Sequence, residues 1–188
     1  MKITAVDDGL DLFLVEDILP EDLLELVTKE KFYDYPWDSQ EMQADFNRRR
    51  LLVQDISILN QVDQVYNSCL SMIEQHLRIS FYDKRCWSSF WLDFQGFHCP
   101  VHLDGAERNL TPKLAMQIYL SESAESQLGT VFYHDDQGEN VRYSVPYRMN
   151  TGYIMINGPE QWHGMLNEIP SDHWRLSSYT YFMNFDHK

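Results

Sequence analysis

The sequence has little cysteine, few basic residues and no long apolar run. Its three cysteines, Cys69, Cys86 and Cys99, are an odd number at wide spacing, which predicts reduced thiols rather than a disulfide framework. Fifteen Lys and Arg stand against 29 Asp and Glu, and the net charge of −14 disfavours nucleic acid and anionic membranes as partners. No apolar stretch approaches the roughly 20 residues that cross a bilayer, and Asp7 and Asp8 come before any signal-like run. We therefore expect a soluble, cytoplasmic protein with no nucleic-acid and no membrane partner.

Aromatic and other hydrophobic residues are plentiful. They make up 14% and 44% of the chain, which favours a β-rich globular protein over a disordered one. At 188 residues the chain is long enough to bury a core without disulfides. We expect a single domain over residues 1–188, with a helical N-terminal support and possible lid in 1–78 and a β core in 79–188.

The N-terminal part shows helical patterns around an irregular stretch. Residues 10–19 predict a strand that runs into a turn, and Pro20 opens a helix with an acidic first turn. Apolar side chains recur at helical spacing over residues 59–77, which predicts a second helix. Residues 31–50 show neither the helical nor the strand spacing of apolar residues, and they carry aromatic anchors. This irregular segment predicts a lid.

From residue 79 onward, short segments rich in aromatic and β-branched residues alternate with turn residues. The predicted strands lie near residues 86–94, 98–104, 112–121, 129–134, 140–146, 151–157, 162–167 and 173–184. Helices followed by about eight strands predict an α+β, mainly β fold, with the helices packed outside a β-sandwich or barrel.

One predicted strand carries His102 and Asp104 two residues apart. Side chains on a strand repeat every second residue, so the two would share a face. A ferrous site of the facial-triad type needs two histidines and one carboxylate, with open positions for substrate and oxygen. The third ligand must come from another strand, and His163 fits because it follows a turn after an apolar strand.

A late strand predicts an anion site beside this candidate metal centre. Arg175, Ser177 and Tyr179 alternate along it and would share one face. An arginine that points into an apolar interior is costly unless it meets an anion, and its planar fork suits a carboxylate. The pattern predicts an anionic cosubstrate in addition to a metal.

Other polar clusters have simpler interpretations. His134 and Asp136 repeat the His-x-Asp spacing, but their Asp, Gln and Gly neighbours predict a solvent-facing hairpin loop. His98 and Cys99 could suggest zinc, but no second Cys/His pair completes a tetrahedral set, so a packing role is favoured. The run 48–50, three arginines, either receives an anionic substrate at the barrel mouth or forms a solvated face.

Taken in order, His102-x-Asp104, His163 and Arg175-x-Ser177 resemble the signature of the Fe(II)- and 2-oxoglutarate-dependent dioxygenases. The match covers about residues 86–184 and is closest to the prolyl-hydroxylase-like branch. This resemblance implies a double-stranded β-helix, also called a jelly roll and similar to a cupin, with the N-terminal helices packed on one sheet.

The resemblance also implies a role for individual residues. The triad His102, Asp104 and His163 would bind Fe(II) and carry catalysis, with O2 as the oxidant. Arg175 would pair with the distal carboxylate of 2-oxoglutarate, helped by Tyr119 and Ser177. One departure is that the tyrosine found about ten residues before the first ligand in several hydroxylases is replaced here by Leu92 or Trp91.

The implied activity is hydroxylation of an unactivated C–H bond. The presence of Asp104 argues against halogenation, because related halogenating enzymes lack this carboxylate. A prolyl residue in a peptide or protein is the leading substrate, by analogy only. Two alternatives stay open: hydroxylation of a free amino acid or small metabolite, and a non-catalytic cupin-like protein that binds a metal or ligand.

Overall fold

The structure is a computed structural model of the whole chain. It describes residues 1–6, 11–32, 47–51, 57–82, 86–104, 114–122, 126–158, 160–182 and 185–187. Residues 33–46, which form most of the predicted lid, lie outside the described residues, as do residues 105–113 after Asp104.

The described residues contain three α-helices, which are α1 (Glu21–Lys29), α2 (Ser57–Ser68) and α3 (Leu70–Leu77). The helix predicted at 59–77 is therefore two helices. Ser68 ends the first, where its hydroxyl donates to the carbonyl of Val65 at 2.6 Å and competes with the backbone pattern. Arg78, in the left-handed region at φ 55°, ends the second.

A large antiparallel sheet forms the centre of the fold. Within the described residues it has seven strands in the order β1-β2-β9-β6-β11-β5-β3. Their bounds are β1 Lys2–Ala5, β2 Leu12–Glu16, β9 Thr151–Ile156, β6 Leu114–Tyr119, β11 Trp174–Phe182, β5 Trp87–Phe94 and β3 Arg48–Leu51. The strands come from both sides of residue 78, so the N-terminal part supplies sheet as well as helical support.

Two smaller sheets accompany it among the described residues. One has three antiparallel strands, and the other pairs two short strands, one of which lies near the C-terminus of the chain. Their bounds are β10 Trp162–Met165, β7 Thr130–Tyr133 and β8 Val141–Ser144 for the first, and β12 Phe185–His187 and β4 Ile79–Phe81 for the second, with a 3-10 turn η3 at Ser126–Leu128.

The strand prediction holds for most segments after residue 79, with shorter bounds, but it is wrong for residues 98–104. There the chain forms only an isolated antiparallel bridge between His102 and His163. Pro100 lacks the N–H that a continuous ladder needs, which explains why the segment does not extend into a strand. The pattern also did not predict β1, β3, β4 and β12.

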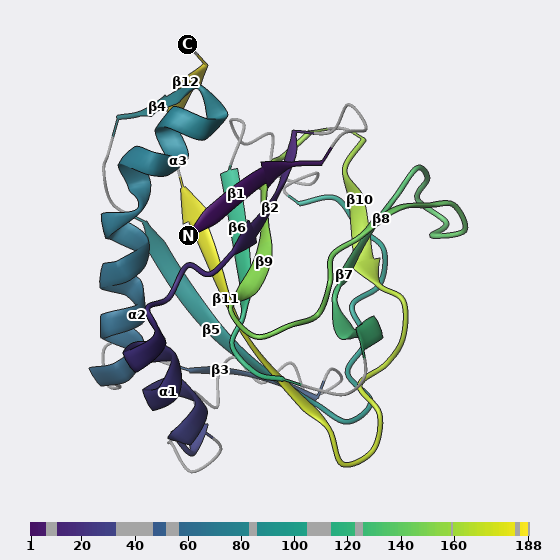
Figure 1. Ribbon diagram of the computed structural model, residues 1–188. Helices are drawn as coiled ribbons and strands as arrows, with labels where there is room; N and C mark the ends of the chain where they lie inside the picture. The colour runs from purple at the N-terminus through teal and green to yellow at the C-terminus, as the bar shows by residue number, and fades with distance from the viewer. Residues whose placement is uncertain are drawn as a thin grey trace.

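The large sheet is covered on both faces. The three helices lie against one face and the sheet β10-β7-β8 lies on the other side (Figure 1). On β11 the side chains alternate accordingly: Leu176 and Phe182 join the helix-side core, whereas Arg175 and Tyr179 line a cavity between the sheets. Both faces of the central strands are therefore buried.

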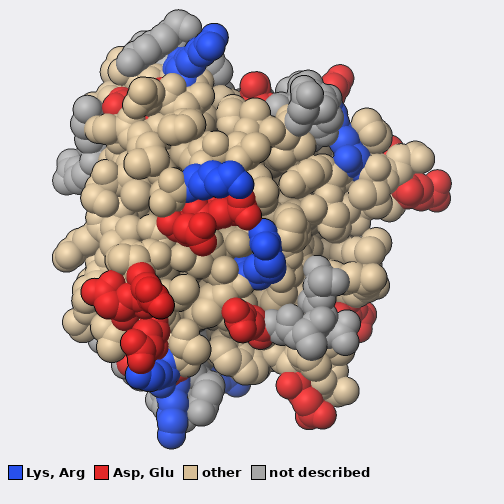
Figure 2. Space-filling model, in the orientation of Figure 1, with Lys and Arg blue, Asp and Glu red and all other residues tan. Residues whose placement is uncertain are grey.

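Basic side chains are scattered over the face shown in Figure 2. Among the residues drawn in colour there, basic side chains lie singly or beside acidic ones and form no continuous basic surface. Glu16, for example, accepts from Nζ of Lys2 at 2.8 Å and from Nη2 of Arg148 at 2.7 Å.

None of the helices in the described part of the chain combines the length and the apolar character needed to cross a membrane.

Candidate active site

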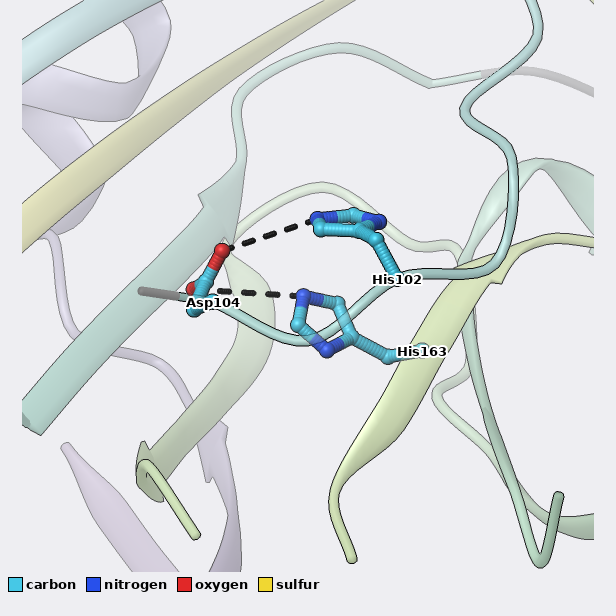
Figure 3. A group of neighbouring side chains, drawn as sticks. All are labelled: His102, Asp104 and His163. Atoms are coloured by element: carbon cyan, nitrogen blue, oxygen red, sulfur yellow. Dashed lines mark ion pairs between the residues drawn. The ribbon is translucent and has the colours of Figure 1, made fainter. Parts of the chain in front are cut away.

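The structure brings together the three residues that the sequence predicts as metal ligands. His102, Asp104 and His163 each offer a ligand atom, and these atoms lie within 4.8 Å of one another. Nε2 of His102 is 3.5 Å from Oδ1 of Asp104, and Nε2 of His163 is 3.9 Å from Oδ2 (Figure 3). Among the described residues, no other group of three His, Cys, Asp or Glu side chains meets this spacing.

The two imidazole rings are oriented in the same way. Nδ1 of His102 lies 2.8 Å from the carbonyl oxygen of Pro100, and Nδ1 of His163 lies 2.9 Å from that of Gln161. Because a carbonyl only accepts, Nδ1 carries the proton in each ring. Both Nε2 atoms therefore face Asp104, and Nε2 is the atom that binds a metal once it carries no proton.

The backbone holds the two histidines side by side. The N–H of His102 donates to the carbonyl of His163 at 2.9 Å, and the N–H of His163 donates back at 3.0 Å. Gly164 permits this approach, because a Cβ at that position would lie 2.8 Å from the carbonyl oxygen of Cys99 and 3.0 Å from that of Pro100.

The pKa values of the three groups are shifted in different directions. The hydrogen bond with Asp104 raises the pKa of His102 to about 10, and the Cys99 thiol acts in the same direction. Burial lowers the pKa of His163. Burial raises the pKa of Asp104, but His102, His163 and the hydroxyl of Tyr179, which donates to Oδ2, outweigh it, so the net pKa lies below its usual value.

A cavity of about 210 Å³ opens beside the three residues. Its wall includes the triad and, from the large sheet, Arg175, Gln117 and Tyr153. A space this small holds a compact ligand, since sites for drug-sized molecules span about 300–1,000 Å³.

Arg175 lies at this wall but already has an anionic partner. Its Nε and Nη2 donate to Oδ2 of Asp93 at 2.9 and 2.7 Å, and Nη1 donates to the carbonyl of Leu128 at 2.7 Å. The sequence argument that this arginine requires an anion holds, but the anion that the structure places there is Asp93. This aspartate was missed, although it follows Trp91 at strand spacing in β5.

Tyr119 and Ser177 do not line the cavity. The hydroxyl of Tyr119 accepts from the N–H of Thr130 at 2.7 Å and donates to its Oγ1 at 3.1 Å. Ser177 accepts from Nε2 of Gln117 at 3.2 Å. Gln117 and Thr130, which the sequence did not single out, form the wall in front of them, with Oγ1 of Thr130 donating to Oε1 of Gln117 at 2.8 Å.

The competing clusters take the simpler roles predicted for them. His134 and Asp136 are exposed in the turn between β7 and β8. Nε2 of His98 donates a hydrogen bond to the carbonyl oxygen of Met165 at 3.0 Å, and among the described residues His98 belongs to no group with metal-ligand spacing. The three cysteines are free thiols.

Trp91 and Leu92, one of which replaces the upstream tyrosine of several hydroxylases, lie on opposite faces of β5. Trp91 lines the cavity, whereas Leu92 is buried in the helix-side core. Trp91 therefore takes the cavity-facing position.

No protein-family model and no curated protein matches the sequence. The structure, however, is similar to several solved ones. A prolyl-4-hydroxylase from Pseudomonas putida superposes with a TM-score of 0.65 at 17% identity, covering 94% of each chain. A prolyl hydroxylase from Trichoplax adhaerens, in complex with a hypoxia-inducible-factor peptide fragment, gives 0.64 at 9% identity, covering 93% of this chain and 84% of that one.

HygX from Streptomyces hygroscopicus, with nickel, 2-oxoglutarate and hygromycin B bound, gives a TM-score of 0.63 at 12% identity, covering 93% of this chain and 84% of that one. At such low identities the likeness shows a shared fold. The predicted resemblance is thus confirmed at the level of the fold, which this chain shares with two solved prolyl hydroxylases and with HygX.

Proposed function

We propose that this protein is an Fe(II)- and 2-oxoglutarate-dependent oxygenase that hydroxylates an unactivated C–H bond. The observation that carries the proposal is the convergence of two Nε2 atoms and one carboxylate at the wall of a cavity that Arg175 also lines. We further propose that the two facing sheets form a double-stranded β-helix, which the likeness to the hydroxylase structures supports.

The donor set fits a ferrous ion. Two imidazoles and one carboxylate are the facial triad of non-haem iron oxygenases, and both rings already present Nε2 to one point. When bound, iron with 2-oxoglutarate and O2 supplies the oxidation of R–H to R–OH, with succinate and carbon dioxide as the other products. His102, Asp104 and His163 would hold the metal.

The other residues of the cavity would bind the cosubstrate and restrict the access of water. Arg175 would bind the distal carboxylate of 2-oxoglutarate through its two remaining N–H groups, since three of its five are already used. Gln117 and Thr130, rather than Tyr119 and Ser177 directly, would complete that wall. Tyr153 and Tyr179 restrict water, which limits side reactions near the metal.

The cavity favours a substrate of which only a small part enters. With 2-oxoglutarate bound in about 210 Å³, one side chain can reach the metal while the rest of the substrate stays outside. A prolyl residue in a peptide or protein is the leading candidate. A free amino acid or small metabolite is the second, since HygX holds hygromycin B. A cupin-like binding protein without turnover is the candidate outside catalysis.

An anaerobic titration tests the proposal. Adding Fe(II) and then 2-oxoglutarate should produce the weak visible metal-to-ligand band of this chelate. Exposure to O2 should then yield succinate, faster in the presence of prolyl peptides than of free amino acids. A protein that binds Fe(II) but shows neither the band nor succinate would be the binding protein instead.

Single substitutions then assign the ligands. We expect His102→Ala and Asp104→Ala to abolish succinate formation, because each removes one third of the metal's protein ligands. His134→Ala is the matched control, since its ring is exposed in a turn. Full activity in either of the first two variants would remove that residue from the triad.

A further inference from the structure

A second arginine lies against the same buried carboxylate as Arg175. Arg48, from β3, places Nε 2.5 Å from Oδ1 of Asp93 and Nη2 3.2 Å from Oδ2. In the sheet, Asp93 of β5 stands directly opposite Arg48 on one side and Arg175 of β11 on the other. The three side chains therefore form one row across three neighbouring strands.

This row carries an unbalanced positive charge. Burial alone raises the pKa of Asp93, but the two guanidinium groups outweigh it and hold that pKa below its usual value, so the carboxylate stays charged. Two cations then face one anion. Among the described residues, no second carboxylate forms an ion pair with either arginine. Asp93 is fully buried and Arg175 is 2% exposed, whereas the side chain of Arg48 is 26% exposed, so Arg48 is the member of the row that solvent reaches.

Both arginines of this row line the cavity and keep donors that Asp93 does not use. Among the described residues, two N–H groups of Arg175 have no hydrogen-bond partner, and neither have three of Arg48, of which only the Nε and one N–H of Nη2 are used. Both also lie against the ring of Phe97, at 4.2 Å for Arg48 and 5.9 Å for Arg175, which keeps water from one side.

We propose that Arg48 and Arg175 form a paired-arginine subsite for one carboxylate of the cosubstrate, with Asp93 as the fixed counterion between them. This deepens the proposed function and rests on it. One incoming carboxylate balances the excess charge of the row. Arg48 thereby selects 2-oxo dicarboxylic acids over 2-oxo monocarboxylic acids, so the N-terminal part of the chain supplies a cosubstrate contact.

Binding of two ligands to the metal-loaded protein tests this subsite. Mn(II) replaces Fe(II) so that no turnover occurs, and calorimetry measures the Kd of 2-oxoglutarate and of 2-oxopentanoate, which has the same carbon chain without the distal carboxylate. Arg48→Gln should weaken 2-oxoglutarate about 10- to 100-fold, the range for one lost charged hydrogen bond, and leave 2-oxopentanoate unchanged. Arg48→Lys keeps the charge with fewer donors and should fall between.

Two further variants separate direct contact from indirect effects. Arg50→Gln is the matched control: it changes the same residue type two positions along β3. Both guanidinium groups lie over the ring of Trp91, at 5.0 Å for Arg48 and 5.8 Å for Arg50, but Arg50 is not among the residues that line the cavity. It should alter neither Kd. Asp93→Asn removes the counterion and should leave 2-oxoglutarate binding as tight or tighter. An equal loss in Asp93→Asn and Arg48→Gln would show that Arg48 acts only through Asp93 and overturn the subsite.

The outcomes distinguish the two proposals. Unaltered protein that binds Mn(II) but neither 2-oxo acid contradicts the oxygenase function itself. Unaltered protein that binds 2-oxoglutarate, with the same Kd in Arg48→Gln, contradicts the paired-arginine subsite and leaves the oxygenase function standing. If Asp93→Asn does not fold, the comparison of Arg48→Gln with Arg48→Lys and Arg50→Gln still decides between these results.

Discussion

At the residue scale, backbone carbonyls orient both histidines of the candidate metal site. Each histidine donates its Nδ1 proton to a carbonyl two residues earlier in the chain, so neither ring needs to rotate. Such partners fix ring orientation and strengthen the ligand. What the metal has to displace is the proton that His102 shares with Asp104.

Metal affinity should therefore rise with pH. In the metal-free protein the pKa of His102 is about 10, so Nε2 carries a proton at pH 7 and must lose it on binding. The pKa values of His163 and Asp104 are lowered, so neither adds a proton there. We expect about one proton released per metal ion at pH 7 and an affinity that gains about tenfold per pH unit up to the pKa. Calorimetry in buffers of different ionisation enthalpy measures the release.

The raised pKa of His102 also predicts how the stability of the metal-free protein depends on pH. Because the folded pKa of His102 lies above the unfolded value of 6.5, the stabilisation by Asp104 is fully present below pH 6.5 and is lost as pH rises through about 10. Metal affinity and metal-free stability should therefore change in opposite directions between these pH values. An affinity that is flat over this range would contradict the assignment of the proton to His102.

Tyr179 should affect metal affinity indirectly, through its hydrogen bond to Asp104. Its hydroxyl donates to Oδ2 of Asp104 and fixes the direction of that carboxylate. We expect Tyr179→Phe to weaken metal affinity about tenfold, the lower end for partners of metal ligands. Tyr147→Phe is the control, because it also removes a buried hydroxyl, bonded to Ser121 at 2.7 Å, away from the triad. Equal effects of the two variants would mean that the loss is general.

At the element scale, the site depends on how closely the segment before His102 crosses β10. Gly164 allows that crossing, and an added Cβ would meet two carbonyl oxygens of the segment. The same crossing sets the bridge between His102 and His163. A change of backbone spacing here moves one ligand relative to the other.

We expect Gly164→Ala to lower stability by about 1–3 kcal/mol, the usual cost of overpacking, and to weaken metal affinity as well. Gly158→Ala is the matched control, because a Cβ there meets nothing within 4 Å. Thermal unfolding and metal titration measure the two effects. Unchanged metal affinity in Gly164→Ala would show that the segment can shift without moving His102.

At the scale of the whole molecule, two hydrophobic cores share one sheet. The helix-side core contains Leu59 of α2, and the core between the sheets contains Phe132 of β7, whose ring lies 5.5 Å from that of His163. Stability can therefore be lowered on one side without disturbing the site on the other.

We expect Leu59→Ala to lower the free energy of unfolding by about 2–5 kcal/mol and to leave the metal Kd unchanged while the protein stays folded. Phe132→Leu should alter both quantities, because it changes the packing of a ligand ring. Chemical denaturation and metal titration separate the outcomes. A weaker metal affinity in Leu59→Ala would show that the helices help to shape the site.

The sequence predicted the grouping of the three candidate metal ligands better than it predicted the partner of Arg175. His102, Asp104 and His163 were found because strand spacing and a distant histidine specify their chemistry, although the strand predicted for the first two is only a bridge. Arg175 was found because the alternation along its strand predicted that its side chain points into an apolar interior. Asp93 could not be paired with it, because 82 residues separate them and only strand pairing makes them neighbours.

Sequence alone determined local periodicity and chemistry: which segments alternate, which are helical, and that imidazole, carboxylate and guanidinium groups fall on alternating positions. These features depend on near neighbours along the chain. Only the tertiary structure decided which strands lie side by side. That choice placed Arg48 and Arg175 on either side of Asp93 and moved Gln117 and Thr130 in front of Tyr119 and Ser177. Register between distant strands is fixed by burial of the whole sheet, which no single segment encodes.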